Sequence, residues 1–238
     1  MKLDILAFGA HPDDVELGAG GTLIKHLQQG KKVGIVDLTR GELGTRGSAD
    51  LRDQEAARSS EIMGLTVREN LHMADGFFEH SRENLLAVVR AVRKYQPDIV
   101  LANAISDRHP DHGKGSKLVS EGCFLAGLVK IETESQGQPQ EKWRPKAVYH
   151  YIQDRYIHPD FVVDVSEQWD LKMQTVLAFS SQFRQPQEGE DVTPLTTPEF
   201  MDALKGKFAT FGRSIQAAYA EGFTVERTPG VHDLFDLH

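Results

Sequence analysis

The chain has 238 residues, of which 27 are basic and 35 acidic, and its net charge is −8. An acidic chain lacks the positive surface that broad nucleic-acid binding needs, and its apolar runs are far shorter than the roughly 20 residues that cross a bilayer. Cys123 is the only cysteine, so any metal site must use histidines and carboxylates. The apolar neighbours of Cys123 predict that its thiol is packed in the core. The length suits one domain over residues 1–238. The first residues include an acidic side chain, which is unlike a secretory signal, and this predicts a cytoplasmic protein.

The first part of the chain alternates strand patterns with helix patterns. The nearly all-apolar run from Leu3 to Ala10 predicts a strand buried on both faces, and the segment from Val15 to Gln29 has apolar residues at helical spacing. Similar patterns follow as a strand at 32–38, helices at 51–63 and 82–95, and a strand at 98–103. The alternation predicts an α/β fold, a Rossmann-like three-layer domain with a mainly parallel sheet.

From about residue 146 the pattern becomes less regular, and we expect a C-terminal layer there. Strands are predicted at 147–152, 161–165 and 223–226, and helices at 168–179 and 198–220. Phe208, Phe211 and Tyr219 have helical spacing and are expected to pack in the core. The polar segment 180–197 predicts a loop over or beside a binding site, and the stretch 134–141 predicts a solvated loop.

Two similar motifs follow two of the predicted strands. The sequence HPDD occupies positions 11–14, after the first strand, and HPDH occupies positions 109–112, after the strand at 98–103. A single motif of this kind is also typical of a turn with a capped helix. Because ligands bind at the carboxyl ends of strands in open α/β sheets, we expect the two motifs to meet. Their imidazoles and carboxylates suit Zn²⁺ or a similar divalent ion with three protein ligands, and a spare carboxylate could act as a general base.

These two motifs resemble the signatures of the LmbE/PIG-L family of zinc-dependent N-acetylglucosamine deacetylases. The run 8–23 and the glycine-rich segment 39–47 further resemble the branch of bacillithiol biosynthesis, which deacetylates N-acetylglucosaminyl-malate. The resemblance is strong over residues 2–127 and weaker thereafter. It implies a hydrolase that removes the N-acetyl group from an amino-sugar conjugate, and a homo-oligomer, which in the nearest branch is a hexamer.

Carried over position by position, the family pattern implies a role for each residue of the motifs. The implied metal ligands are His11, Asp14 and His112. Asp13 would be the general base, His109 would stabilise the oxyanion, and Asp111 would orient an imidazole. The expected metal is Zn²⁺, although the same ligands accept Fe²⁺, manganese or cobalt. Whether Asp13 or His109 protonates the leaving amine stays open.

Three residues outside these roles are expected to bind the substrate. Arg52 matches a sugar-binding arginine of the family, with a solvated helix charge as the alternative. Asp75 matches an acid that holds sugar hydroxyls, and a turn-forming Asp-Gly is its alternative. Arg108 would bind a carboxylate such as that of malate through two parallel hydrogen bonds. Asp107 stands where the mycothiol branch has a tyrosine, so a tyrosine-assisted oxyanion is not expected.

Other functions compete with this interpretation. The chain could deacetylate a different amino sugar, such as a chitooligosaccharide or an antibiotic precursor, or bind a sugar without turnover. Asp13 favours an enzyme, because a binding protein has no need of an unliganded acid beside the metal ligands. The glycine-rich run 18–21 lacks the third glycine of a dinucleotide-binding loop, so NAD is not expected. The expected partner is a small amino-sugar substrate, with no nucleic acid and no membrane.

Overall fold

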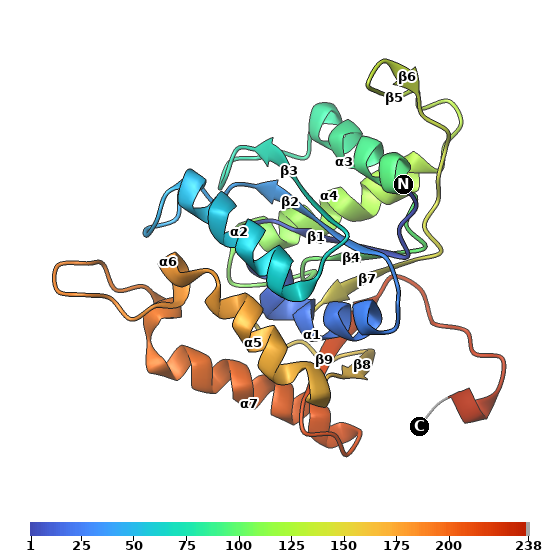
Figure 1. Cartoon of the computed structure of the whole chain (residues 1–238). Helices are drawn as coiled ribbons and strands as arrows, with labels where there is room; N and C mark the ends of the chain where they lie inside the picture. Colours follow the sequence, from blue (N-terminus) through green and yellow to red (C-terminus); the bar gives the residue numbers. More distant parts are fainter. Residues whose placement is uncertain (237–238) are drawn as a thin grey trace.

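A seven-stranded sheet runs through the centre of the computed structural model, which describes residues 1–236 (Figure 1). Five neighbouring strands are parallel, and in order across the sheet they are β3 (Val67–Met73), β2 (Val33–Thr39), β1 (Ile5–Gly9), β4 (Ile99–Ala102) and β7 (Ala147–Tyr151). Two antiparallel strands complete the sheet, β9 (Ala220–Val225) and β8 (Phe161–Asp164). The prediction of a mainly parallel α/β sheet is confirmed.

Helices cover both faces of this sheet, which gives the three layers that the alternating pattern predicts (Figure 1). They are α1 (Asp14–Gln28), α2 (Ala49–Met63), α3 (Arg82–Tyr95), α4 (Pro110–Ala126), α5 (Trp169–Leu177), α6 (Ser180–Phe183) and α7 (Pro198–Ser214). Leu6 and Phe8 of β1 belong to the core shared with α3 and α4, whereas Ile5 and Ala7 belong to the core shared with α1. The whole strand is buried, because successive side chains alternate between two covered faces.

The strand order reverses next to β1, and this reversal positions the site. β1 pairs with β2 on one side and with β4 on the other, in parallel on both sides. The carboxyl ends of β1 and β4 therefore lie side by side at a topological switch point. The two sequence motifs begin just beyond these two ends, so the fold brings them together.

Helix α1 lies directly against the sheet because residue 18 is a glycine. A Cβ atom at Gly18 would lie 2.2 Å from the ring of Tyr151 in β7, a separation that real side chains do not adopt. The Tyr151 hydroxyl donates to the carbonyl oxygen of Phe8 at 2.8 Å, so the ring is held between β1 and the helix. This packing holds α1, whose first residue belongs to the HPDD motif, close to the end of β1.

The C-terminal layer packs on the α1 side of the sheet. A core cluster joins Trp169 of α5 to Phe208 and Phe211 of α7. The prediction of one helix over 198–220 was wrong at its end, because α7 stops at Ser214 and Gln216 takes a left-handed conformation with φ 60°. Tyr219 lies beyond the helix, and its ring stacks on Trp169 with centroids 4.1 Å apart.

Three further differences from the sequence prediction concern the periphery. Strand β3 was not predicted, and the stretch 134–141 contains a small hairpin of β5 (Glu134–Ser135) and β6 (Gln138–Pro139). Segment 180–197 includes α6 and a short 3-10 helix, Pro194–Thr196.

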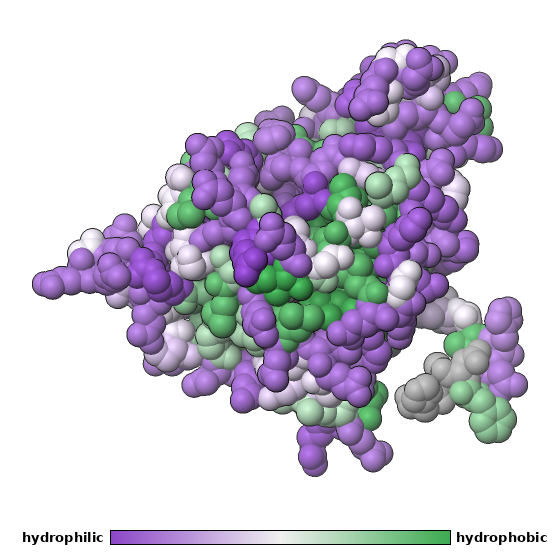
Figure 2. Space-filling model, in the orientation of Figure 1, coloured by the Kyte–Doolittle hydropathy of each residue, from purple (hydrophilic) through white to green (hydrophobic). Residues whose placement is uncertain are grey.

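Within residues 1–236 no helix combines the length and apolar character that a membrane span requires. The face in Figure 2 is mostly hydrophilic, with hydrophobic residues gathered near its centre.

Candidate metal centre and active site

The HPDD motif forms a tight, strained turn between β1 and α1. Asp13 has φ 112° and ψ −25°, a backbone conformation that residues other than glycine rarely adopt. Strain of this kind persists only where the surrounding structure enforces it, and it is common at active sites. Asp14 is the first residue of α1, and its carboxylate Oδ2 accepts a hydrogen bond from the backbone N–H of His11 at 2.9 Å. The turn therefore holds these side chains in a fixed arrangement.

His11, Asp14 and His112 meet where β1 and β4 end. Oδ1 of Asp14 lies 3.1 Å from Nε2 of His112, and Oδ2 of Asp14 lies 3.5 Å from Nδ1 of His11. All three side chains are about nine-tenths buried or more. The three groups expected to bind a metal thus face one another across a space of a few ångströms.

Each imidazole is oriented by a carboxylate on its far side. Nε2 of His11 lies 3.0 Å from Oδ1 of Asp75, and Nδ1 of His112 lies 2.5 Å from Oδ2 of Asp107. When each of these nitrogens donates its proton to the carboxylate, the opposite nitrogen keeps its lone pair. Those free nitrogens are the two that face Asp14. The ligand atoms of His11, His109 and His112 all lie within 4.8 Å of one another, as do those of His11, Asp75 and Asp111, so this centre could hold a metal ion.

The charge around the centre also suits a cation. Burial lowers the pKa of His112, but the Asp14 and Asp107 carboxylates outweigh it and raise that pKa to about 9. Burial likewise opposes protonation of His11, yet its acidic neighbours raise its pKa well above the usual value. Burial opposes ionisation of Asp14, but the two imidazoles hold its pKa well below the usual range. The centre therefore has an excess of negative charge that protons or a metal ion can neutralise.

Asp13 lies beside these groups and contacts Arg52. Oδ2 of Asp13 is 3.1 Å from Nη2 of Arg52, and the same guanidinium donates to the backbone oxygen of Pro12. Burial raises the pKa of Asp13 to about 7, and Arg52 opposes that rise. A carboxylate with a pKa near neutrality suits general acid–base chemistry. Gly41, at φ 65°, admits the guanidinium, since a Cβ there would lie 3.0 Å from its central carbon.

His109 is the N-cap residue of α4 and the third imidazole of the site. Its ring centroid lies 4.6 Å from that of His11 and 5.2 Å from that of His112, so it could also supply a metal ligand. Nδ1 of His109 accepts from the backbone N–H of Asp111 at 3.3 Å, which leaves the proton on Nε2. Burial, then the two neighbouring imidazoles, lower the pKa of His109. A neutral ring with a proton on Nε2 is suited to donate a hydrogen bond.

The remaining predicted residues lie around this centre. Asp111 Oδ2 is 3.5 Å from Nε2 of His11 and accepts from the backbone N–H of Gly76, so Asp111 lies beside the imidazole that it could orient. Both oxygens of Asp75 are engaged, one with His11 and the other with the backbone N–H of Leu43. Arg108 is half exposed and forms an ion pair with Asp154 at 2.7 Å.

Two amide side chains that the sequence analysis missed also hold Asp14. Gln153, just after β7, donates from Nε2 to Oδ1 of Asp14 at 2.9 Å, and Asn103, just after β4, donates to Oδ2 at 3.0 Å. Oε1 of Gln153 accepts from Asn103 and from the backbone N–H of Ala104. The only sequence signal for these residues is that each follows a parallel strand, at the same edge as the motifs.

A cavity of about 600 Å³ opens from this centre toward the C-terminal layer. Its outer wall includes Leu195, Phe200, Leu204 and Lys207, from the 3-10 helix and α7. Segment 180–197 therefore lies beside the site, as expected. Arg46, in the glycine-rich segment 39–47, ties the two segments together, because its guanidinium donates to the Arg184 carbonyl and the Glu190 carboxylate.

Fold and site together define an LmbE-like α/β protein whose histidine and carboxylate centre lies at the carboxyl ends of β1 and β4. The family model described as PIG-L, GlcNAc-PI de-N-acetylase, matches residues 6–123. Diacetylchitobiose deacetylase from Thermococcus kodakarensis is 30% identical, over 95% of this chain and 84% of its own. The chain belongs to the PIG-L family of deacetylases.

Two further relatives share the scaffold, and one of them has a name that is not that of a deacetylase. The conserved protein TT1542 from Thermus thermophilus has 35% sequence identity and a TM-score of 0.86, with 98% of both chains covered. A 4-oxalmesaconate hydratase from Pseudomonas putida is 25% identical, over 91% of this chain and 86% of its own. The substrate therefore has to be argued from the site itself.

Proposed function

We propose that this protein is a metal-dependent N-deacetylase that acts on an N-acetylglucosaminyl conjugate, and that the conjugate is N-acetylglucosaminyl-malate in bacillithiol biosynthesis. One observation carries the proposal. The Asp14 carboxylate faces the imidazoles of His11 and His112, while a second carboxylate, that of Asp13, lies beside them with a pKa near 7. Hydrolysis of an amide needs both a cation site and a base, and this pair of carboxylates supports both.

His11 Nδ1, Asp14 and His112 Nε2 would hold the cation, with Zn²⁺ as the first candidate among the divalent ions that accept such ligands. When bound, the ion polarises the amide carbonyl and lowers the pKa of water. Asp75 and Asp107 fix the two imidazoles in the tautomers that this requires. Gln153 and Asn103 hold the Asp14 carboxylate in place.

Asp13 would accept the proton of the attacking water. Arg52 contacts Oδ2 of Asp13, and Oδ1 could accept from the water. The Arg52 guanidinium lines the cavity and could donate to an oxygen of the sugar. His109 would donate from Nε2 to the oxyanion that develops on the amide carbonyl. Either Asp13 or His109 could then protonate the leaving amine.

The hydratase relative makes hydration of a carbon–carbon double bond the second candidate function. Addition of water also needs a base and a cation site, so the centre alone does not separate the two reactions. A deacetylase of chitooligosaccharides or of an antibiotic precursor would use the same centre with a different outer cavity. A sugar-binding protein without turnover is disfavoured by the base-like pKa of Asp13.

The test combines metal analysis with a substrate panel. The protein is purified anaerobically, its metal is quantified, and amine release is measured on N-acetylglucosaminyl-malate, N-acetylglucosamine, diacetylchitobiose and an acetylated antibiotic precursor. We expect close to one divalent ion per chain and the fastest release from the malate conjugate. No amine release from any of them would reject deacetylation, and a faster reaction of diacetylchitobiose would reject the malate assignment. One domain, a cytoplasmic location and a homo-oligomer stay predictions.

A further inference from the structure

Three cationic side chains line the cavity, and two of them already have a carboxylate partner. Arg52 is paired with Asp13 at 3.1 Å, and Arg108 is paired with Asp154 at 2.7 Å. The third is Lys207 of α7, whose Nζ atom lies more than 4.0 Å from every carboxylate whose side chain the structure describes, although Asp154 and Asp107 act on its charge from farther away. Lys207 is therefore the cation of this cavity whose charge is left for a ligand.

Lys207 lies in an environment that disfavours an unpaired charge. Its Nζ donates to the backbone oxygen of Gln153, and it lies 5.1 Å from the centre of the Phe208 ring. Burial, and then the nearby Lys172, lower the pKa of Lys207 to about 8. An ammonium group has three donors, and Gln153 accepts from one of them. An anion arriving in the cavity could accept from another and offset the unfavourable burial of the charge.

Part of the cavity lining is apolar, and this strengthens the attraction of Lys207 for an anion. Leu195, Phe200 and Leu204 line the cavity, and the Phe208 ring lies beside the Lys207 ammonium. Charges interact more strongly next to such side chains than in open water, because the effective dielectric constant is lower. The arrangement suits a short carbon skeleton that ends in an anionic group.

Lys207 is also close to the metal centre. Its partner Gln153 places its side-chain Nε2 3.4 Å from Nε2 of His112, so a single residue separates the ammonium from a proposed metal ligand. A sugar whose acetamide lies at the centre would extend its other substituents toward α7. A group attached to the amino sugar could therefore reach Lys207 along the cavity.

We infer that Lys207 is a specificity-determining residue, which binds a carboxylate or phosphate on the group attached to the amino sugar. The inference rests on the proposed deacetylase function and narrows its substrates to anionic conjugates. It assigns to Lys207 the recognition that the sequence analysis expects of Arg108.

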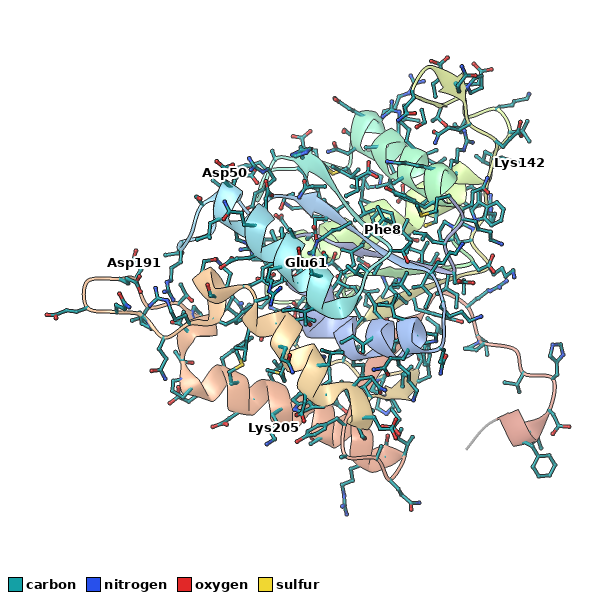
Figure 3. All side chains as sticks on the ribbon, in the orientation of Figure 1. Phe8, Asp50, Glu61, Lys142, Asp191 and Lys205 are labelled. Atoms are coloured by element: carbon teal, nitrogen blue, oxygen red, sulfur yellow. The ribbon has the colours of Figure 1, made fainter. Side chains whose placement is uncertain are left out.

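The test uses the zinc-loaded protein and three ligands that share the sugar. These are methyl N-acetylglucosaminide, which is neutral, N-acetylglucosaminyl-malate, which has carboxylates, and N-acetylglucosamine 1-phosphate. Calorimetry on an Asp13→Asn background, which is expected to bind zinc without turnover, gives the Kd of each ligand, and amine release by the protein with Asp13 gives kcat and KM. The variant is Lys207→Met, which keeps the aliphatic stem, with Lys207→Arg as the charge-conserving variant. Lys205→Met is the matched control, because Lys205 is exposed on the same helix (Figure 3).

We expect Lys207→Met to raise Kd and KM about ten-fold or more for at least one anionic ligand, and to leave kcat and the neutral ligand within about two-fold. Lys207→Arg should retain most of the preference, and Lys205→Met should match the parent protein. The anionic ligand whose Kd and KM rise more in Lys207→Met shows whether Lys207 binds a carboxylate or a phosphate.

An equal loss for the neutral and anionic ligands would overturn the inference, because it would mean that Lys207 only supports Gln153 and the fold. No loss for any ligand, or the selective loss appearing in Arg108→Met instead, would overturn it as well. These results differ from a failure of the proposed function. If the parent protein releases no amine from any ligand, deacetylation is rejected, while the binding data still decide the role of Lys207.

Discussion

Asp107 offers the sharpest test of the proposed metal centre, because its two oxygens have different partners. Oδ2 accepts from Nδ1 of His112 at 2.5 Å, and Oδ1 accepts from the backbone N–H of Arg155 at 2.6 Å. Asp107→Asn replaces one acceptor with an NH₂ donor. If the amide oxygen faces Arg155, the NH₂ group faces His112 and favours a proton on Nε2, the nitrogen proposed to bind the metal. If the amide is reversed, two donors meet at Arg155.

Either orientation removes a charge-assisted hydrogen bond, which contributes about 1.5–3 kcal/mol. At about 1.4 kcal/mol per factor of ten, zinc affinity should fall by roughly ten-fold to a hundred-fold. This agrees with the loss of about 10–100-fold that is usual when a residue orienting a metal ligand is replaced. The affinity is measured by competition with a chromophoric chelator, and thermal unfolding without metal shows whether the fold is intact.

Asp154→Asn is the matched control, because Asp154 also lines the cavity but contacts Arg108 and neither imidazole. It should bind zinc like the parent protein. A folded Asp107→Asn variant with zinc affinity within two-fold of the parent would refute the reasoning. In that case either His112 does not bind the metal, or its orientation does not depend on Asp107.

The other predictions concern the base, a ligand, protons and the thiol. Asp13→Asn should keep the metal but lower turnover by a factor on the order of 10²–10⁴. The control Asp170→Asn changes an exposed residue and should leave turnover unchanged. Near-normal turnover in Asp13→Asn would exclude Asp13 as the base. His112→Ala should lose the metal, and stoichiometric zinc in this variant would exclude His112 as a ligand. His112 has a pKa of about 9, so below that pH a metal ion must displace its proton. The zinc affinity measured by calorimetry should therefore fall by about ten-fold per pH unit below 9 for each displaced proton. An affinity that does not change between pH 6 and 9 would contradict this. Cys123 is buried and burial raises the pKa of its thiol, so it should react with Ellman's reagent only after unfolding in guanidinium; fast labelling of the native protein would oppose this.

The central strands and both motifs could be predicted because their signals are local. The buried run of β1 and the position of HPDD directly after it are both visible in a window of about ten residues. Strand β3 gives no such signal, because it lies at the edge of the sheet and all but one of its residues are at least partly exposed. Its sequence, VRENLHM, therefore lacks the apolar run that identifies a central strand.

The supporting residues of the site could not be predicted from a single sequence. Gln153 contacts Asp14 from a position 139 residues later, and Lys207 lines the cavity from a helix still farther along the chain, so only the folded chain brings them together. Asp107 is different, because it lies only five residues before His112, just ahead of the second motif. An acid so near a predicted ligand is a usable signal for a carboxylate that orients the imidazole.

The strained backbone at Asp13 has a consequence for how relatives of this protein diverge. A positive φ at a residue with a side chain costs on the order of 1–3 kcal/mol, a large share of a net folding free energy of about 5–15 kcal/mol. Glycine would relieve that strain, so the backbone conformation favours glycine at position 13, whereas the ion pair with Arg52 and the proposed catalysis favour aspartate. A lineage that stops turning over its substrate would drift toward glycine there while keeping its metal ligands. We therefore expect aspartate at this position in relatives that turn over a substrate, and glycine there in relatives that only bind one.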